Sequence, residues 1–209
     1  LPRRKKYEYH WLTDINSILS FLSGFRDWPY YPAVLLAVFG GFRRSEILGL
    51  RWSDFDFDRK IVFVTRSIVL NPARDVVIDD LKNDSSRRQI VLPDFLIEFL
   101  QSVIPSGAYL FCHSDGTPLN PDTFTKYYQV YRDKHGLPKI RFHDLRHSHA
   151  SFLFAAGIEP RIIQDRLGHS NIQTTLDIYT HTDVSLQLTS AALLDQAFAD
   201  VLKAESPPN

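Results

Sequence analysis

The sequence predicts an α+β domain that is mainly α-helical and carries a small antiparallel β-sheet. Three observations lead to this fold class. Apolar residues recur at helical spacing before residue 40, short β-rich runs follow between residues 61 and 92, and helical patterns bounded by proline or glycine return from residue 94. The 209 residues suffice for one or two domains with an ample core.

The first helix is expected after a capping residue at Thr13 or Asp14, whose side-chain oxygen can accept a backbone N–H of the first turn. Its apolar residues share one helical face, which we expect to pack on the core. They are Ile15, Ile18, Leu19 and Leu22.

A second helix is predicted over residues 31–39, which are almost continuously apolar and open at Pro32. Such a helix is expected to be buried. It would end at Gly40 and Gly41, because glycine commonly terminates helices. Arg43 follows directly, so a buried helix would give this arginine a rigid support.

A small antiparallel sheet is predicted from three β-rich runs, residues 61–64, 76–78 and 90–92. The polar turn at residues 83–86 lies between the second and third runs. Lys82 would therefore lie at the tip of a hairpin.

Helical patterns fill the rest of the chain, and most of them begin or end at proline or glycine. They cover residues 95–104, 121–134, 143–156, 160–167 and 172–179. Beyond them, residues 184–202 carry an apolar stripe that is suited to a groove in this domain or in a neighbouring copy.

Composition excludes some classes of protein and leaves others open. The formal net charge is zero and the sequence pI is about 7.3, so any affinity for DNA must come from local clusters of basic residues. Such clusters are Arg3–Lys6, Arg43–Arg44 with Arg51, and Arg87–Arg88 beside Lys82. One cysteine, Cys112, and no apolar run near twenty residues favour a reducing, cytoplasmic protein without a membrane span.

The residues with the clearest chemistry lie near the end of the chain. His143 and Arg146 are three residues apart, so on a helix they share a face and can bind one anion such as a phosphodiester. Gly168 permits a tight turn that would present His169. Tyr179 follows ten residues later and could reach the same pocket.

With these residues in view, the sequence resembles the tyrosine recombinases, the phage-type integrases, over roughly residues 12–199. Order and spacing carry the resemblance, because each motif alone is common. The matching segments are Gly41–Glu46 with Leu48–Asp54, Leu81–Arg88 ahead of Gln89–Pro93, His143–Arg146, Leu167–Ser170 and Asp177–Tyr179. The resemblance implies the catalytic-domain fold of DNA breaking and rejoining enzymes.

The resemblance also implies an active site and a reaction. Tyr179 would attack the scissile phosphate and form a 3′-phosphotyrosyl bond, so no cofactor is expected. Glu46 would support the pocket without taking part in the chemistry. The implied catalytic residues are Arg43, Lys82, His143, Arg146, His169 and the nucleophile Tyr179.

Family members usually carry a small DNA-binding domain ahead of the catalytic one. Because this chain begins at Leu1 and contains no methionine, we expect it to be part of a longer protein. Residues 1–9 would be the end of a linker and residues 10–205 the catalytic domain, with a C-terminal helix near residues 184–203. The implied partners are double-stranded DNA at specific sites, three further copies in a tetramer joined through that helix, and accessory excision or bending proteins.

Three alternatives remain beside the integrase hypothesis. His143 and His147 have the spacing of a zinc pair, but no HExxH glutamate or third ligand accompanies them. Residues 160–179 could form a non-catalytic helix-turn-helix that binds DNA, although this would leave Arg43 and Lys82 unexplained. A type IB topoisomerase or telomere resolvase would use the same chemistry without exchanging partners.

Overall fold

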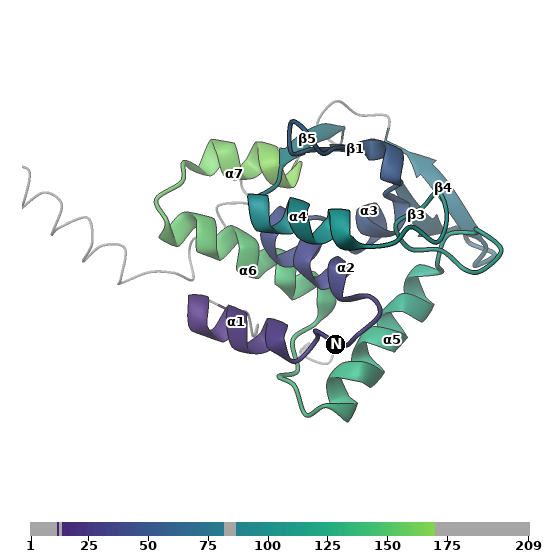
Figure 1. Ribbon diagram of the computed structural model, residues 1–209, viewed down its shortest axis with the longest axis horizontal. Coiled ribbons are helices and arrows are strands. Elements are labelled where there is room, and N and C mark those ends of the chain that lie inside the picture. The colour runs from purple at the N-terminus through teal and green to yellow at the C-terminus, as the bar shows by residue number, and fades with distance from the viewer. Residues whose placement is uncertain (1–11, 13, 82–86, 170–209) are drawn as a thin grey trace, which may run out of the picture.

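The computed structural model of this chain describes residue 12, residues 14–81 and residues 87–169. Within them, two small antiparallel sheets lie at one side of a group of helices (Figure 1). The helical elements are α1 (Ile15–Ser23), α2 (Tyr31–Leu35), the π-helix η1 (Leu36–Gly40), α3 (Arg44–Gly49), the 3-10 helix η2 (Trp52–Asp54), α4 (Asp94–Ser102), α5 (Pro121–Lys134), α6 (Phe142–Ala155) and α7 (Pro160–Leu167). The strands are β1 (Phe55–Asp56), β2 (Ile61–Val64), β3 (Arg66–Leu70), β4 (Val76–Asp80) and β5 (Arg88–Val91).

The α1 helix begins as predicted, with Asp14 as its cap. The Asp14 carboxylate accepts the backbone N–H of Ser17 at 2.9 Å. The expected packing face was only partly right, because Ile15 and Leu19 are 57% and 58% exposed. The buried face is rotated about the helix axis and runs through Ile18, Phe21, Leu22 and Phe25, at the i, i+3, i+4 and i+7 spacing of one helical side.

The predicted apolar helix is confirmed as α2 continued by η1, with Pro32 in its first turn. Its side chains are almost all buried, as a continuously apolar helix requires. Gly41 ends it in the left-handed conformation, with φ of +69°. The chain then turns directly into α3, for which Arg43 is the N-cap residue.

The predicted antiparallel strands are present, but they do not form one sheet. Strands β1, β2 and β5 form one sheet, with Val62 opposite Ile90, whereas β4 pairs with a strand that the sequence reading missed, β3. In residues 66–70 the alternation of polar and apolar side chains is weak, because Arg66 and Ser67 are the first two residues of the strand and both are polar. The expected hairpin between β4 and β5 is therefore not a continuous ladder, and Lys82 at its expected tip lies outside the described residues.

The later helices agree with the sequence prediction within two residues at each end. Asn120 caps α5 by accepting the backbone N–H of Asp122 at 2.9 Å. Gly168 ends α7 in the left-handed conformation, with φ of +65°. The helix expected at residues 172–179 and the apolar stripe at 184–202 lie outside the described residues.

Two apolar clusters hold these elements together. The larger combines α1, α2, η1, α3, α4, α5 and the sheet residues Val62 and Ile90. The smaller, formed by Ala150, Phe154, Ile163 and Leu167, fixes α7 against α6. Among the described residues, no helix combines the length and the apolarity that a membrane crossing requires.

Candidate functional site

Arg43 is held at the start of α3 by a carboxylate one turn along the helix. Its backbone N–H donates to Oε2 of Glu46 at 2.7 Å, and its Nη1 donates to Oε1 at the same distance. The other guanidinium nitrogen donates to the backbone carbonyl of Gly168 at 2.9 Å. About a third of the Arg43 side chain remains exposed, so this arginine is fixed in place and still accessible.

Arg146 lies on α6, with only 3% of its surface exposed. Its guanidinium donates to the carbonyls of Gly41 at 2.7 Å and Leu167 at 2.6 Å, and it lies 3.9 Å from the Glu46 carboxylate. Burial and the nearby Arg43 lower the pKa of Arg146 to about 9. The group therefore remains a cation at neutral pH.

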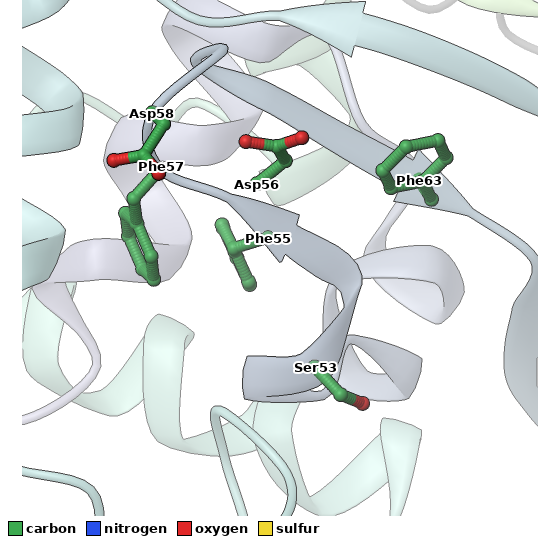
Figure 2. A pocket seen from close by; sticks show the side chains of 6 residues that line it. All are labelled: Ser53, Phe55, Asp56, Phe57, Asp58 and Phe63. Carbon is green, nitrogen blue, oxygen red and sulfur yellow. The ribbon is translucent and has the colours of Figure 1, made fainter.

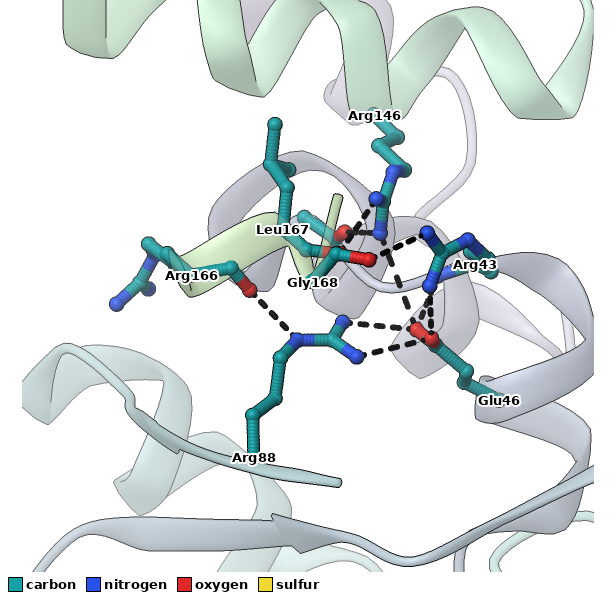
Figure 3. A network of polar contacts seen from close by, with 8 residues as sticks. Arg43, Glu46, Arg88, Arg146, Arg166, Leu167 and Gly168 are labelled. Carbon is teal, nitrogen blue, oxygen red and sulfur yellow. Dashed lines mark hydrogen bonds and ion pairs between the residues drawn. The ribbon is translucent and has the colours of Figure 1, made fainter. Parts of the chain in front are cut away.

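The Glu46 carboxylate is the common partner of three arginines (Figure 3). Arg88 of β5 approaches it end-on, with Nη1 and Nη2 each 2.9 Å from one carboxylate oxygen. Burial of Glu46 opposes ionisation, but Arg88, Arg146 and Arg43 outweigh it and lower the pKa of Glu46 to about 2. Glu46 is thus a buried anion that fixes the positions of cations from three different elements.

The C-terminal end of α7 binds the same three arginines from the other side. The successive carbonyls of Arg166, Leu167 and Gly168 accept hydrogen bonds from Arg88, Arg146 and Arg43, at 2.7, 2.6 and 2.9 Å. The last carbonyls of a helix lack partners within the helix and carry the negative end of its dipole. The left-handed turn at Gly168 ends the helix at the point where these carbonyls meet the arginines.

Two of the expected histidines flank this cluster. His143 is exposed at the start of α6, and its ring lies 4.9 Å from that of His147 and nearly perpendicular to it. Partial desolvation, His147 and Arg146 lower the pKa of His143 to about 4. His169, directly after Gly168, has its pKa lowered to about 3 by partial burial and by Arg146 and Arg43. Both rings are therefore neutral near pH 7.

A pocket of about 370 Å³ opens beside these groups. Arg43 and His143 line it together with two further arginines, Arg44 and Arg141. Arg141 also contacts the fully buried Asp144 at 2.7 Å. The remaining lining residues are Ser45, Thr125, Gln129 and Phe142. This pocket has the positive charge that a phosphodiester requires.

A larger pocket of about 560 Å³ lies at the turn between β1 and β2 and is chemically different (Figure 2). It is lined by Ser53, Phe55, Asp56, Phe57, Asp58 and Phe63. Two carboxylates and no basic side chain among these six residues would repel a phosphate. The smaller basic pocket is therefore the candidate active site.

The structure thus brings together Arg43, His143, Arg146 and His169. Glu46 contacts the two arginines of this group. Lys82 and Tyr179 lie outside the described residues, and the catalytic roles of all six residues remain predictions. No group of three or more His, Cys, Asp or Glu side chains within the described segments is placed to hold a metal ion.

Three further residues support the site. The sequence analysis named Arg88 only as part of a basic cluster and a matching segment, and it missed Arg166 and His149. Arg166 donates to Nε2 of His149 at 3.0 Å and to the carbonyl of Phe39 at 3.1 Å. Because a guanidinium only donates, Nδ1 of His149 carries the proton and bonds the Val38 carbonyl at 2.8 Å. One available signal was the alternation of β5, which places Arg88 on the same face as the buried Ile90.

Comparisons with known proteins show which family the chain resembles. Residues 12–185 match the sequence family described as the phage integrase family. A tyrosine recombinase XerC-like protein of Caldanaerobacter subterraneus subsp. tengcongensis is 29% identical over 216 residues, which cover 88% of this chain and 53% of that protein. The ICEBs1 integrase of Bacillus subtilis is 29% identical over 174 residues, which cover 77% of this chain and 47% of the integrase. The chain spans about half the length of the curated relatives it matches.

Solved structures show the same fold. The Tn1549 transposon integrase in complex with circular intermediate DNA superposes with a TM-score of 0.76 at 24% identity, over 91% of this chain and 68% of that one. The same integrase in complex with transposon right end DNA gives 0.73 at 26% identity, over 94% and 68% of the two chains. XerA recombinase gives 0.64 at 21% identity, over 100% of this chain and 68% of the other.

Proposed function

Because this chain belongs to the phage integrase family, we propose that it is the catalytic domain of a site-specific DNA recombinase, the integrase of a phage or another mobile element. The enzyme would cut and rejoin DNA through a 3′-phosphotyrosine intermediate, acting on DNA in the cytoplasm. The relatives described above as tyrosine recombinases and integrases support this assignment.

The observation that carries the proposal is the pair Arg43 and Arg146, held rigidly by Glu46 and by the end of α7. Each guanidinium is fixed by bonds of 2.6–2.9 Å before any substrate arrives. Preorganised cations of this kind stabilise the charge that develops on the nonbridging oxygens of a phosphodiester, and such stabilisation often dominates catalysis. The partial exposure of Arg43 into the basic pocket gives the phosphate its point of entry.

The reaction we propose has two steps. The Tyr179 oxygen attacks the scissile phosphorus, the bond from phosphorus to the 5′-oxygen breaks, and Lys82 protonates that leaving oxygen. The energy of the broken bond is kept in the phosphotyrosyl linkage. A 5′-hydroxyl of the partner strand then attacks the phosphorus of this linkage, and Tyr179 is released. The two steps require no ATP and no metal ion.

The neutral histidines suit this sequence of steps. With its pKa lowered to about 4, His143 is unprotonated near pH 7 and can accept the proton that Tyr179 loses. Binding of the phosphate would raise the pKa of both His143 and His169, because an adjacent anion favours the imidazolium form. His169 would then donate a hydrogen bond to a nonbridging oxygen or to the nucleophile.

The assembly proposed for the whole protein rests on membership of the phage integrase family. A DNA-binding domain would precede residues 1–9, which would be the end of a linker, and the catalytic domain would occupy residues 10–205. The helix at about residues 184–203 would dock on a neighbouring copy and link four subunits on DNA. Exposed apolar side chains at α6 and α7 support such docking: Phe152, Ile158 and Ile162 are 37%, 37% and 56% exposed. Accessory excision or bending proteins would set the direction of the reaction.

The test is a covalent-capture assay in EDTA. The substrate is a nicked duplex built from the junctions of the genomic element that encodes the chain, and the full-length protein is compared with its Tyr179→Phe variant. Denaturing gels then detect protein joined to DNA. The expected result is a covalent band that the phenylalanine variant lacks.

Other outcomes separate the alternatives. Sequence-specific binding without any covalent band would support a helix-turn-helix binding module and contradict catalysis. A covalent band together with relaxation of supercoiled plasmid, but without joining to a second duplex, would indicate topoisomerase or resolvase activity.

A further inference from the structure

Arg88 connects β5, α3 and α7, whose relative positions determine where the arginines of the candidate site lie. It extends from β5, donates to both oxygens of Glu46 on α3 at 2.9 Å, and donates through Nε to the carbonyl of Arg166 on α7 at 2.7 Å. Only 7% of its side chain is exposed, and it is not among the residues that line the basic pocket. Arg88 is therefore placed to act on the site without contacting DNA.

The partners of Arg88 are the same two groups that hold the phosphate-binding arginines. Glu46 binds the Nη1 of Arg43, and the two carbonyls after that of Arg166 accept from Arg146 and Arg43. A shift of Glu46 relative to the end of α7 would therefore move Arg43 away from one of its two anchors. Arg88 is bonded to both sides of that junction and keeps the separation between them constant.

We infer that Arg88 is a positioning residue for DNA cleavage, which sets the distance between Glu46 and the end of α7 and thereby aligns Arg43 with Arg146. This inference rests on the proposed recombinase function. It assigns a role in the reaction to an arginine that touches neither the substrate nor the reacting atoms.

The Arg88→Lys variant distinguishes the effect of hydrogen-bond geometry from the effect of positive charge. An ammonium keeps the positive charge beside Glu46, but its donors radiate from one nitrogen, whereas Arg88 uses three nitrogens to reach two carboxylate oxygens and a carbonyl. If Arg88 acts through geometry, Arg88→Lys should slow cleavage strongly. If it supplies only charge, the variant should cleave like the wild type.

Arg132 provides a matched control. Its side chain is 10% exposed, and like Arg88 it donates to one carboxylate, that of Asp133, and to one carbonyl, that of Ile140. It is not among the residues that line the basic pocket. Arg132→Lys therefore reports what the loss of a similarly bonded buried arginine does to the domain as a whole.

The experiment measures single-turnover cleavage of the nicked duplex at saturating DNA by the full-length wild type and both variants, with the DNA dissociation constant and melting temperature of each. For Arg88→Lys we expect cleavage slower by about 100-fold, the effect of misplacing a catalytic group by about 1 Å, with unchanged DNA affinity. Arg132→Lys should cleave at a rate close to the wild type. Equal rates for Arg88→Lys and wild type would overturn the inference, as would equal slowing in both variants.

Two further measurements keep the result decisive. Should Arg88→Lys not fold, Arg88→Gln takes its place, with Arg132→Gln as its control. Because this variant also removes the charge, the position of Arg43 in its crystal structure then decides whether Arg88 acts through geometry. A crystal structure of the variant should show Arg43 separated from either Glu46 or the Gly168 carbonyl, and an unchanged Arg43 would contradict the inference. Failure of the wild type to cleave would instead refute the proposed function, and the crystal structure would still decide whether Arg88 sets the geometry.

Discussion

Replacing Glu46 by glutamine should destabilise the folded domain by several kcal/mol at neutral pH. The substitution keeps the shape of the side chain but leaves Arg88 and Arg146, which are 7% and 3% exposed in their side chains, without their shared anion. Removing one partner of a buried ion pair typically costs about 3–5 kcal/mol.

The pKa of Glu46 gives an independent magnitude. The fall from the usual 4.5 to about 2 means that the fold favours the carboxylate by about 3 kcal/mol, at about 1.4 kcal/mol for each pH unit between the two values. Because the pKa is lower in the folded state, this stabilisation is complete above pH 4.5 and is lost as the pH falls through 2. At pH 3 it should have decreased to about 1 kcal/mol.

The assay is urea unfolding of wild type and Glu46→Gln at pH 7 and at successively lower pH. The difference in unfolding free energy should be about 3 kcal/mol at pH 7 and should shrink below pH 4.5. Glu98→Gln is the control, because Glu98 is exposed on α4 and a surface change of this kind stays within about 0.5 kcal/mol. A difference for Glu46→Gln below about 1 kcal/mol at pH 7, or one that does not vary with pH, would refute the reasoning.

Three further predictions follow from the same geometry. Gly41→Ala should destabilise the domain by about 2–5 kcal/mol in thermal or urea unfolding, because φ is +69° and the new Cβ would lie 2.5 Å from Cδ2 of His149. The control is Gly116→Ala, where φ is +81° but the space around the new Cβ is open. This variant should lose only about 1–2 kcal/mol of stability. Arg146→Lys should keep DNA binding and lower the single-turnover cleavage rate by about 100-fold or more, because an ammonium cannot reproduce the guanidinium geometry; a rate within tenfold of the wild type would contradict this. Burial and Arg166 lower the pKa of His149 in the folded domain to about 3, whereas its pKa in the unfolded chain is near 6.5. The folded domain should therefore lose stability as the pH falls below 6.5, by about 2 kcal/mol at pH 5. His149→Gln should flatten that part of the pH dependence, and an unchanged slope in urea unfolding between pH 6.5 and 5 would contradict the assignment.

The local elements could be predicted because their signals are local. Proline at position 121 or 160 and glycine at 41 or 168 mark where helices begin and end, and these boundaries were found to within two residues. Strand pairing was harder to predict. The predicted run at residues 76–78, part of β4, was assigned to the wrong sheet because its partner, β3, opens with a polar pair and gives a weak alternation signal.

The residues of the candidate site also fall into those that local sequence motifs indicate and those that only the structure reveals. Arg43, His143, Arg146 and His169 could be named from sequence motifs, and the structure places the two histidines near the two arginines. The supporting roles of Arg88, Arg166 and His149 could not be predicted, because they depend on partners far along the chain. Arg88 and Glu46 are 42 residues apart, and His149 and Val38 are 111 residues apart.

The sequence alone therefore determined the fold class and the helix boundaries and named most of the candidate site residues, since propensity, capping and motif order are properties of neighbouring residues. Only the tertiary structure decided which groups hold the arginines and which ionisation states they adopt. Those depend on burial and on cations from α3, β5 and α6 meeting one carboxylate and one helix end. A carboxylate with a pKa of about 2 that is shared by three arginines arises only when those elements are packed together.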